Sequence, residues 1–471
     1  MKMNYILDHD DLQYQSVPLP EDILKMKWSG RLDLAKAMIE NRLSQPDLPH
    51  AYRARLTMEL KNIGHLKLNY RKTKAEILEA IQKRIPDFTM EEVDQCILEG
   101  RLEWIFIDGE ERFMGNTVYN LFRQYPDMWA RTAEGDTRDS SLLNELMDKL
   151  PPVGGDMKAH IHIRHDLQLD DEMVEPGKML HVYLPVPLQR QQITNLKINN
   201  ISPQPQRMPQ EGDVQPAAYF EVPAEYGQVF SVEYEFDNVT RYVDLSQADF
   251  DAVAAAAAEG YPEDVLPYLQ ERGPHILFTP YLRELAAEII GDETNPLKIA
   301  RLIYDYITCK LSYSFMRDYT ALDSIAEYMA INRKGDCGVQ AILFITLCRL
   351  AGVPARWQSG LDAEPHDVGE HDWAQFYVPT IGWVYCDPSF GMSCRLRNQE
   401  KLWNFYFGNL DPYRIPLNCD MQYDFVPPKK FIRVDPTDSQ AGEIEYEDGG
   451  IYGGRTRTFT DLGIRLIEED K

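Results

Sequence analysis

The sequence predicts an α+β, multi-domain protein, and three observations favour this class. The chain has 471 residues, enough for about three domains of roughly 150 residues each. Residues 1–150 carry helical signals, residues 155–248 alternate apolar and polar side chains, and the remainder combines helical and strand patterns. With 44% hydrophobic and 26% charged residues, the composition is that of a globular protein and excludes a fibrous or largely disordered chain.

Residues 1–150 are predicted to be a mainly helical domain. Thr73-Lys-Ala-Glu76 and Thr89-Met-Glu-Glu92 have the spacing of capping boxes, in which a threonine and a glutamate satisfy the first free amides of a helix. Downstream, Asp108-Gly109 separates two apolar runs, which predicts a β-hairpin. The order helix, helix, hairpin makes residues 73–115 similar to a winged helix.

That winged-helix pattern raises the possibility of DNA binding, which the charges oppose. The would-be recognition helix carries Glu91, Glu92, Asp94 and Glu99, which would face the phosphates with negative charge. We therefore favour a packing or protein-contact module, and expect protein contacts through the N-terminal domain.

Residues 155–248 are predicted to form a β-sandwich, because their apolar residues alternate in runs separated by Pro, Gly, Asn and Gln. His160 and His162 would share one face of a strand, while His165 would face the other way. This arrangement favours cross-strand pairing over a metal site. Residues 431–471 are acidic and dotted with glycine, so we expect an acidic C-terminal extension without chemistry.

The charge balance excludes several classes of partner. There are 49 Lys and Arg residues against 75 Asp and Glu residues, a formal charge of −26, which repels phosphate backbones and anionic membrane surfaces. We expect no nucleic acid and no membrane partner. The first residues lack the pattern of a secretory signal, which favours a cytoplasmic location. The seven cysteines include no Cys-x-x-Cys pair, which argues against a disulfide framework or a structural zinc site.

The chemistry is expected in the segment that begins at Lys334-Gly-Asp-Cys337. Asp336 suits a helix N-cap, and residues 339–350 are apolar nearly all round, which predicts a buried helix that Gly352 and Pro354 end. Cys337 would lie in the first turn of this helix. The helix dipole there favours a thiolate and so predicts a lowered thiol pKa.

Two further residues complete a predicted catalytic group. His371 lies in an alternating run that ends at Val378, and Asp387 ends the run that begins at Gly382. If residues 379–382 turn the chain back, two antiparallel strands bring His371 and Asp387 together against the helix of Cys337. The sequence therefore predicts a Cys-His-Asp triad of nucleophile, general base and orienting carboxylate. His366, in a polar loop, is the rival base.

These segments resemble the transglutaminase-like superfamily of cysteine hydrolases and acyl transferases. The resemblance is carried by four motifs in order: Gly335-Asp-Cys337, Gly352-Val-Pro-Ala-Arg356, His371-Asp-Trp373 and Gly382-Trp-Val-Tyr-Cys-Asp-Pro388. It implies a papain-like transglutaminase core over residues 260–430, and residues 155–248 are similar to the β-domain that precedes this core in bacterial members.

The resemblance also implies roles for individual residues. Cys337 would be the nucleophile, His371 the base and acid, and Asp387 the residue that orients the imidazole. The Cys337 amide and an upstream donor would hold the oxyanion, with Tyr313 as the candidate donor. Asp336 is also a candidate for the wall of the cleft, and Trp373 for either the cleft wall or the core.

The expected activity is attack on an amide or ester of a peptide or protein substrate, through an acyl-thioester. We favour hydrolysis by water, which would make the protein a peptidase or amidase. Two alternatives stay open: acyl transfer to an amine, as by a protein-glutamine acyltransferase, and a catalytically silent binding or assembly protein. We expect no cofactor and no metal.

Overall fold

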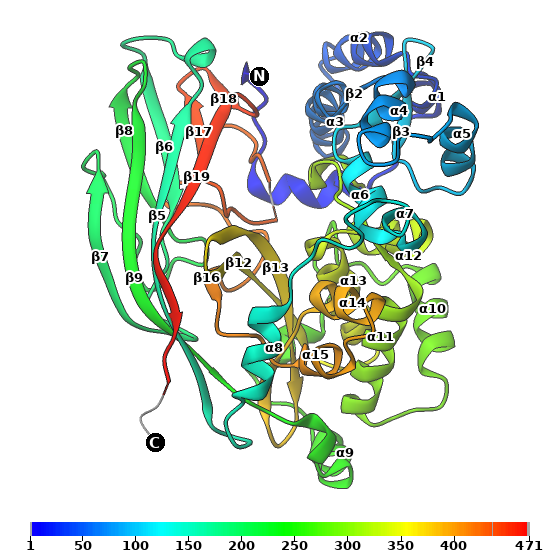
Figure 1. Cartoon of the computed structure of the whole chain (residues 1–471). Helices are drawn as coiled ribbons and strands as arrows, with labels where there is room; N and C mark the ends of the chain where they lie inside the picture. Colours follow the sequence, from blue (N-terminus) through cyan, green and yellow to red (C-terminus); the bar gives the residue numbers. More distant parts are fainter. Residues whose placement is uncertain (1, 436, 469–471) are drawn as a thin grey trace.

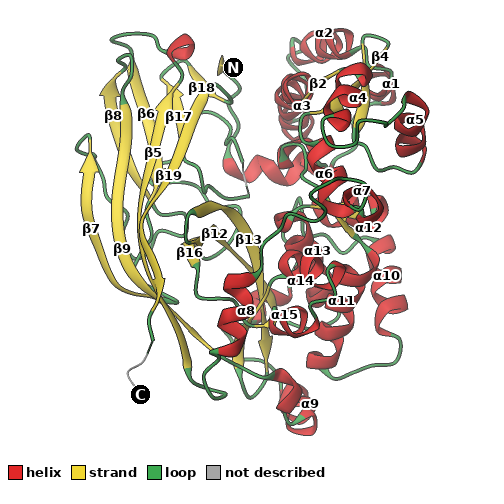
Figure 2. Cartoon of the chain, viewed as in Figure 1, coloured by secondary structure: helices red, strands yellow, loops and turns green. Residues whose placement is uncertain are grey.

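The computed structural model describes residues 2–435 and 437–468. Two β-sheets lie on one side of the molecule and helices on the other, with a further sheet between them (Figures 1 and 2). The predicted α+β class is confirmed. Within the described residues, no helix combines the length and apolarity that crossing a membrane requires.

The first part of the chain consists mostly of helices. Both predicted capping boxes are present, at Thr73 and Thr89. Asp108 and Gly109 form the predicted hairpin turn with φ angles of 51° and 83°. The elements are η1 (His9–Ser16), α1 (Glu21–Trp28), α2 (Leu32–Leu43), α3 (His50–Asn69), β2 (Tyr70–Lys72), α4 (Lys74–Gln82), α5 (Met90–Leu98), β3 (Trp104–Ile107), β4 (Glu110–Met114), α6 (Thr117–Gln124), α7 (Pro126–Trp129) and α8 (Ser141–Asp148).

The two sheets on the other side share one apolar core. Their strand orders are β1-β18-β17-β6-β8 and β19-β5-β9-β7. His160 pairs with Asp237 and His162 with Glu233, each at 2.9 Å, as the predicted cross-strand row requires. The strands within the predicted sandwich region are β5 (Asp156–Leu169), β6 (Met179–Pro185), β7 (Ile193–Ser202), β8 (Ala217–Pro223) and β9 (Val229–Arg241).

The C-terminal residues differ from the expected acidic extension. They form β17 (Glu443–Tyr446), β18 (Gly449–Ile451) and β19 (Arg455–Leu466). β17 pairs with β6, β19 pairs with β5, and the N-terminal β1 (Lys2–Met3) pairs with β18. β17 and β18 also pair with each other. Because the other partners of these strands lie far away in the chain, the short and glycine-dotted pattern does not reveal the strands locally.

The sheet between the two sides has the strand order β15-β14-β13-β12-β16. Its strands are β12 (Ala355–Glu364), β13 (Asp367–Val378), β14 (Gly382–Cys386), β15 (Phe407–Gly408) and β16 (Arg414–Asn418). The buried helix α13 (Cys337–Leu350) packs against β12 and β13. The surrounding elements are α9 (Phe250–Glu259), α10 (Pro280–Ile290), α11 (Pro296–Lys310), β10 (Ser312–Tyr313), η5 (Tyr319–Ala321), α12 (Ile325–Asn332), β11 (Lys334–Gly335), α14 (Pro388–Leu396) and α15 (Glu400–Phe405).

Candidate functional site

Cys337 is the first residue of α13, as predicted. Asp336 is the N-cap, and its carboxylate accepts a hydrogen bond from the Val339 amide at 3.2 Å. The Cys337 side chain is neither fully buried nor fully exposed. The core helix therefore presents the thiol at its first turn, where the free amides of the helix lie.

His371 and Asp387 are brought together by an antiparallel pair of strands. β13 and β14 pair up to Val378 and Gly382, and the chain turns between them through Thr380, which has a φ of 80°. His371 Nε2 donates to Asp387 Oδ2 at 2.6 Å, deep in the protein. This contact fixes the ring and assigns the proton to Nε2, so that Nδ1 is the nitrogen that remains for proton transfer.

Asp387 is surrounded by donors that favour its charged form. Its Oδ1 accepts hydrogen bonds from the Phe390 amide at 2.9 Å and the Ser389 hydroxyl at 3.0 Å, and Arg414 Nη2 lies 3.5 Å from its Oδ2. Complete burial alone would raise the pKa of Asp387, but His371, these donors and Arg414 lower it overall. Asp387 therefore remains a carboxylate.

The Cys337 thiol contacts Asp372. Cys337 Sγ donates to Asp372 Oδ2 over 3.4 Å. Burial raises the pKa of the Cys337 thiol well above its ordinary value, and the negative charges of Asp372 and Asp336 raise it further. This differs from the predicted lowered thiol pKa, because desolvation and two nearby carboxyl groups outweigh the helix dipole.

Asp336 is buried beneath the first turn of α13 rather than forming an open cleft wall. The Tyr319 hydroxyl donates to Asp336 Oδ1 at 2.5 Å, and the Met316 amide donates to its Oδ2 at 3.3 Å. Burial raises the pKa of Asp336 to about 6, although these hydrogen bonds favour its charged form. The residue caps the helix and adds negative charge next to the thiol.

Of the two positions expected for Trp373, the structure has the core and not the cleft wall, because the side chain has no exposed surface. Its indole N–H donates to Gln358 Oε1 at 2.6 Å, and its ring centroid lies 5.9 Å from that of His371. Trp373 therefore supports His371 from within the protein. Trp373 lies two residues after His371 on β13, so the two side chains share one face of the strand, which suits a buried position as well as a cleft wall.

Tyr313, the candidate oxyanion donor, lies near the nucleophile. β10 and β11 run parallel, and Tyr313 pairs with Gly335. Burial raises the pKa of Tyr313 well above its ordinary value, and charges on Cys337 and Asp336 raise it further. The phenol is therefore a neutral hydroxyl within electrostatic reach of Cys337.

The rival base lies elsewhere. His366 has a side chain that is 94% exposed and lies 3.5 Å from Asp461 on β19. It occupies the turn between β12 and β13, with a φ of 68°. Its solvent-exposed position gives it no orienting partner comparable with Asp387.

Three residues of the site were not predicted from the sequence: Asp372, Arg414 and Gln440. Gln440 donates to the His371 carbonyl at 3.1 Å and also to the Asp372 carboxylate. Arg414 has no exposed surface and pairs with Asp411 at 2.7 Å as well as with Asp387. The aspartate inside the His371-Asp-Trp373 motif was the one local signal, whereas Arg414 and Gln440 reach the site only through the fold.

Comparisons with known proteins bear on the same segment. Residues 283–388 match the family model of the transglutaminase-like superfamily. An uncharacterized protein of Haemophilus influenzae is 27% identical over 202 residues, covering 36% of this chain and 53% of that protein. The protein-glutamine gamma-glutamyltransferase of Pseudomonas aeruginosa is 25% identical over 122 residues, covering 24% of this chain and 18% of that protein. The chain thus spans 53% of the first relative's length and 18% of the second's.

Solved structures give more distant similarities. The "putative cysteine protease" of Cytophaga hutchinsonii has a TM-score of 0.45 and 16% identity, covering 67% of this chain and 93% of that one. The periplasmic domain of TgpA from Pseudomonas aeruginosa has a TM-score of 0.27 and 13% identity, covering 55% of this chain and 94% of that one. The resemblance to the transglutaminase-like superfamily, predicted from the motifs around Cys337, His371 and Asp387, is confirmed by the family match over residues 283–388.

Proposed function

We propose that this protein is a thiol hydrolase that cleaves amide bonds of peptides or proteins through an acyl-thioester on Cys337. The observation that carries the proposal is the 2.6 Å hydrogen bond between His371 Nε2 and the buried Asp387 carboxylate. It orients an imidazole within the same site as a thiol at a helix N-terminus. A nucleophile, a base and an orienting carboxylate are the parts that covalent catalysis requires.

The reaction begins with transfer of the thiol proton from Cys337 Sγ to His371 Nδ1. The sulfur attacks the carbonyl carbon, and the carbonyl oxygen becomes an oxyanion. The C–N bond then breaks as His371 returns the proton to the leaving nitrogen. Water next attacks the thioester while His371 takes one of its protons, the C–S bond breaks, and the thiol forms again. Asp387 stays ionised and stabilises the imidazolium in both steps.

Oxyanion stabilisation is assigned to the backbone amide of Cys337 and the hydroxyl of Tyr313. A donor aimed at the developing charge is worth about 2.7–4 kcal/mol in comparable sites. Tyr313 suits the role because its raised pKa keeps the proton on the phenol.

Acyl transfer to an amine is the second candidate, favoured by the similarity to the Pseudomonas aeruginosa protein-glutamine gamma-glutamyltransferase. The two reactions share every step up to the thioester and differ only in whether water or an amine attacks it. Digestion of a peptide mixture with and without methylamine separates them. Free carboxylates indicate hydrolysis, whereas methylamides indicate transfer.

The proposal is tested by turnover of that peptide mixture in wild type, Cys337→Ala, His371→Ala and the control His366→Ala. We expect no turnover in Cys337→Ala, a loss of about 10²–10⁴-fold in His371→Ala, and full activity in His366→Ala. Circular dichroism establishes that each variant is folded. Unchanged turnover in folded Cys337→Ala contradicts the proposal, and a silent binding protein would show no turnover in any variant.

A further inference from the structure

Asp372 lies against the nucleophile but takes no part in the steps described above. It follows His371 on β13, yet the two side chains have different partners. His371 contacts Asp387, whereas Asp372 Oδ2 accepts the hydrogen bond of Cys337 Sγ at 3.4 Å. Two adjacent residues of β13 therefore contact different parts of the site: His371 contacts Asp387, which orients the base, and Asp372 contacts the nucleophile Cys337.

The first turn of α13 is shaped to admit the Asp372 carboxylate. A Cβ atom at Gly338 would lie 2.6 Å from Asp372 Oδ2 and 2.4 Å from the Tyr319 hydroxyl oxygen. Any side chain at this position would therefore displace the Asp372 carboxylate or the Tyr319 hydroxyl. The glycine after Cys337 therefore leaves the space in which the carboxylate reaches the thiol.

Asp372 is also held from its other side by a segment near the C-terminus, residues 429–435 and 437–443, which we call the strap. Gln440 of the strap donates to the Asp372 carboxylate and, at 3.1 Å, to Asp438 Oδ2. The carboxylate thus lies between the thiol and an amide donor, with little freedom to turn away.

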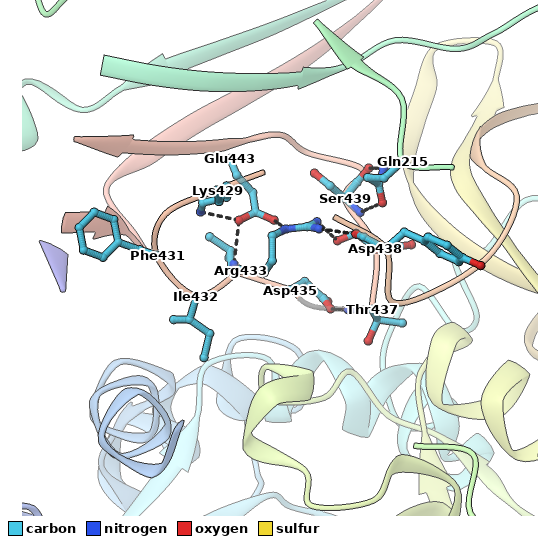
Figure 3. A network of polar contacts seen from close by, with 12 residues as sticks. Gln215, Lys429, Phe431, Ile432, Arg433, Asp435, Thr437, Asp438, Ser439 and Glu443 are labelled. Atoms are coloured by element: carbon cyan, nitrogen blue, oxygen red, sulfur yellow. Dashed lines mark hydrogen bonds and ion pairs between the residues drawn. The ribbon is translucent and has the colours of Figure 1, made fainter. Parts of the chain in front are cut away.

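Buried ion pairs fix the strap itself (Figure 3). Arg433 Nε donates to Glu443 at 2.6 Å, and Arg433 Nη2 donates to the Asp438 carbonyl at 3.0 Å. Lys429 pairs with the same Glu443 at 2.8 Å. From α3, Lys61 donates to the carbonyls of Arg433 at 2.7 Å and Val434 at 2.9 Å. The position of Gln440 is therefore set by the folded protein.

The groups that face this pair are mostly acidic. Asp438 and Asp435 of the strap and Asp336 at the start of α13 act on Asp372. Asp336 and Asp387 act on Cys337 as well. Burial raises the pKa of Asp372 well above its ordinary value, and these carboxyl groups raise it further. Tyr313 and Tyr319 also lie within electrostatic reach of the thiol.

We propose that Asp372 is a positioning residue that holds the resting nucleophile as a thiol and opposes formation of the thiolate. Since Cys337 is the nucleophile only under the proposed function, this role rests on that function. The thiol proton lies in the hydrogen bond to Asp372 Oδ2 at rest. It passes to His371 Nδ1 when the thiol turns away from Asp372 and then leaves with the amine. When the thioester is hydrolysed, His371 passes a proton of the attacking water to the sulfur, and the hydrogen bond to Asp372 forms again.

The test is the pH dependence of iodoacetamide alkylation of Cys337 in the full chain, with the modified peptide identified by mass spectrometry. In Asp372→Asn, we expect the apparent thiol pKa to fall by about one unit or more. For each unit by which the thiol pKa falls, alkylation at pH 7 should be about threefold faster, because the fraction of thiolate increases more than the nucleophilicity of the thiolate decreases. Asp367→Asn, which removes an exposed carboxylate from the same strand, should retain the wild-type profile.

If Asp372→Asn does not fold, Gln440→Ala tests the same role, because it frees the carboxylate to leave the thiol. We expect the apparent thiol pKa to fall there too, by less than in Asp372→Asn. A profile equal to wild type, or an apparent pKa above it, in either folded variant overturns the proposal. Alkylation measures the thiol and not turnover, so full turnover in Cys337→Ala would refute the proposed function independently of this result.

Discussion

Asp387 and Asp372 are two buried carboxyl groups in one site, and they are held in opposite electrostatic surroundings. Asp387 has 0% and Asp372 has 7% of its surface exposed. Asp387 meets an imidazole, a guanidinium and backbone and hydroxyl donors, and its pKa is lowered. Asp372 meets a thiol, one amide and other carboxyl groups, and its pKa is raised.

The difference shows that burial alone does not decide the direction in which the pKa of a carboxyl group shifts. Desolvation is the largest cause acting on both residues and raises the pKa of each. Whether the pKa is raised or lowered overall depends on whether a cation accompanies the carboxyl group. His371, which has the larger effect, and Arg414 accompany Asp387, whereas the charges acting most on Asp372 are those of Asp438, Asp336 and Asp435.

The largest loss of stability is expected from removing the guanidinium of Arg414. Arg414→Met leaves the buried Asp387 and Asp411 and the partly buried Asp362 without their guanidinium partner. We expect a loss of about 3–5 kcal/mol in the free energy of unfolding, measured by urea denaturation at pH 7. Arg457→Met, which removes an exposed ion pair with Glu370, is the control and should cost at most about 1 kcal/mol. Equal losses in the two variants would contradict the role assigned to Arg414.

A smaller loss is expected from neutralising Asp387. Asp387→Asn keeps an oxygen to cap α14 but loses the charge that pairs with His371 and Arg414, so we expect a cost of about 2 kcal/mol at pH 7. The folded pKa of Asp387 is lowered. Its stabilisation is therefore complete above the unfolded value of about 4 and is lost as pH falls through the folded pKa. Urea denaturation from pH 7 to pH 3 should show the cost shrinking, and a constant cost would contradict the assigned ionised state.

The smallest effect is expected from Asp372→Asn, and it has the opposite sign. Because the folded pKa of Asp372 is raised, its contribution to stability is complete below the unfolded pKa of about 4 and is lost as pH rises through the folded pKa. The substitution should therefore stabilise the protein by about 1 kcal/mol at pH 8 and change little at pH 4. A loss of stability at pH 8 would contradict the claim that the pKa values of Asp372 and Asp387 are shifted in opposite directions.

The parts of the site that were predictable from the sequence depend on local patterns. The N-cap at Asp336 and the antiparallel pairing of the strands that carry His371 and Asp387 follow from capping chemistry, alternation and a turn, and the structure has both. The hydrogen bond of His371 to Asp387 needed only that these strands be adjacent.

The parts that were not predictable depend on distant segments. Arg414 enters through β16, which pairs with β12, and Gln440 enters through the strap. The strap is positioned by Lys61 of α3 and by the ion pair between its own residues Lys429 and Glu443. Nothing in the sequence near Cys337 encodes these contacts. The expected low thiol pKa was wrong for a similar reason: the helix dipole is local, whereas the burial of the thiol and its contact with Asp372 are produced by the fold.

The central claim is that Cys337 carries the acyl group with His371 as its base, and trapping the acyl-enzyme tests it most directly. The full chain is mixed with p-nitrophenyl acetate, quenched in acid and digested for mass spectrometry, alongside Cys337→Ala and His371→Ala. We expect one acetyl group on the peptide containing Cys337 in wild type, none there in Cys337→Ala, and much slower labelling in His371→Ala. Acetylation of another residue with p-nitrophenol release undiminished in Cys337→Ala would contradict the account.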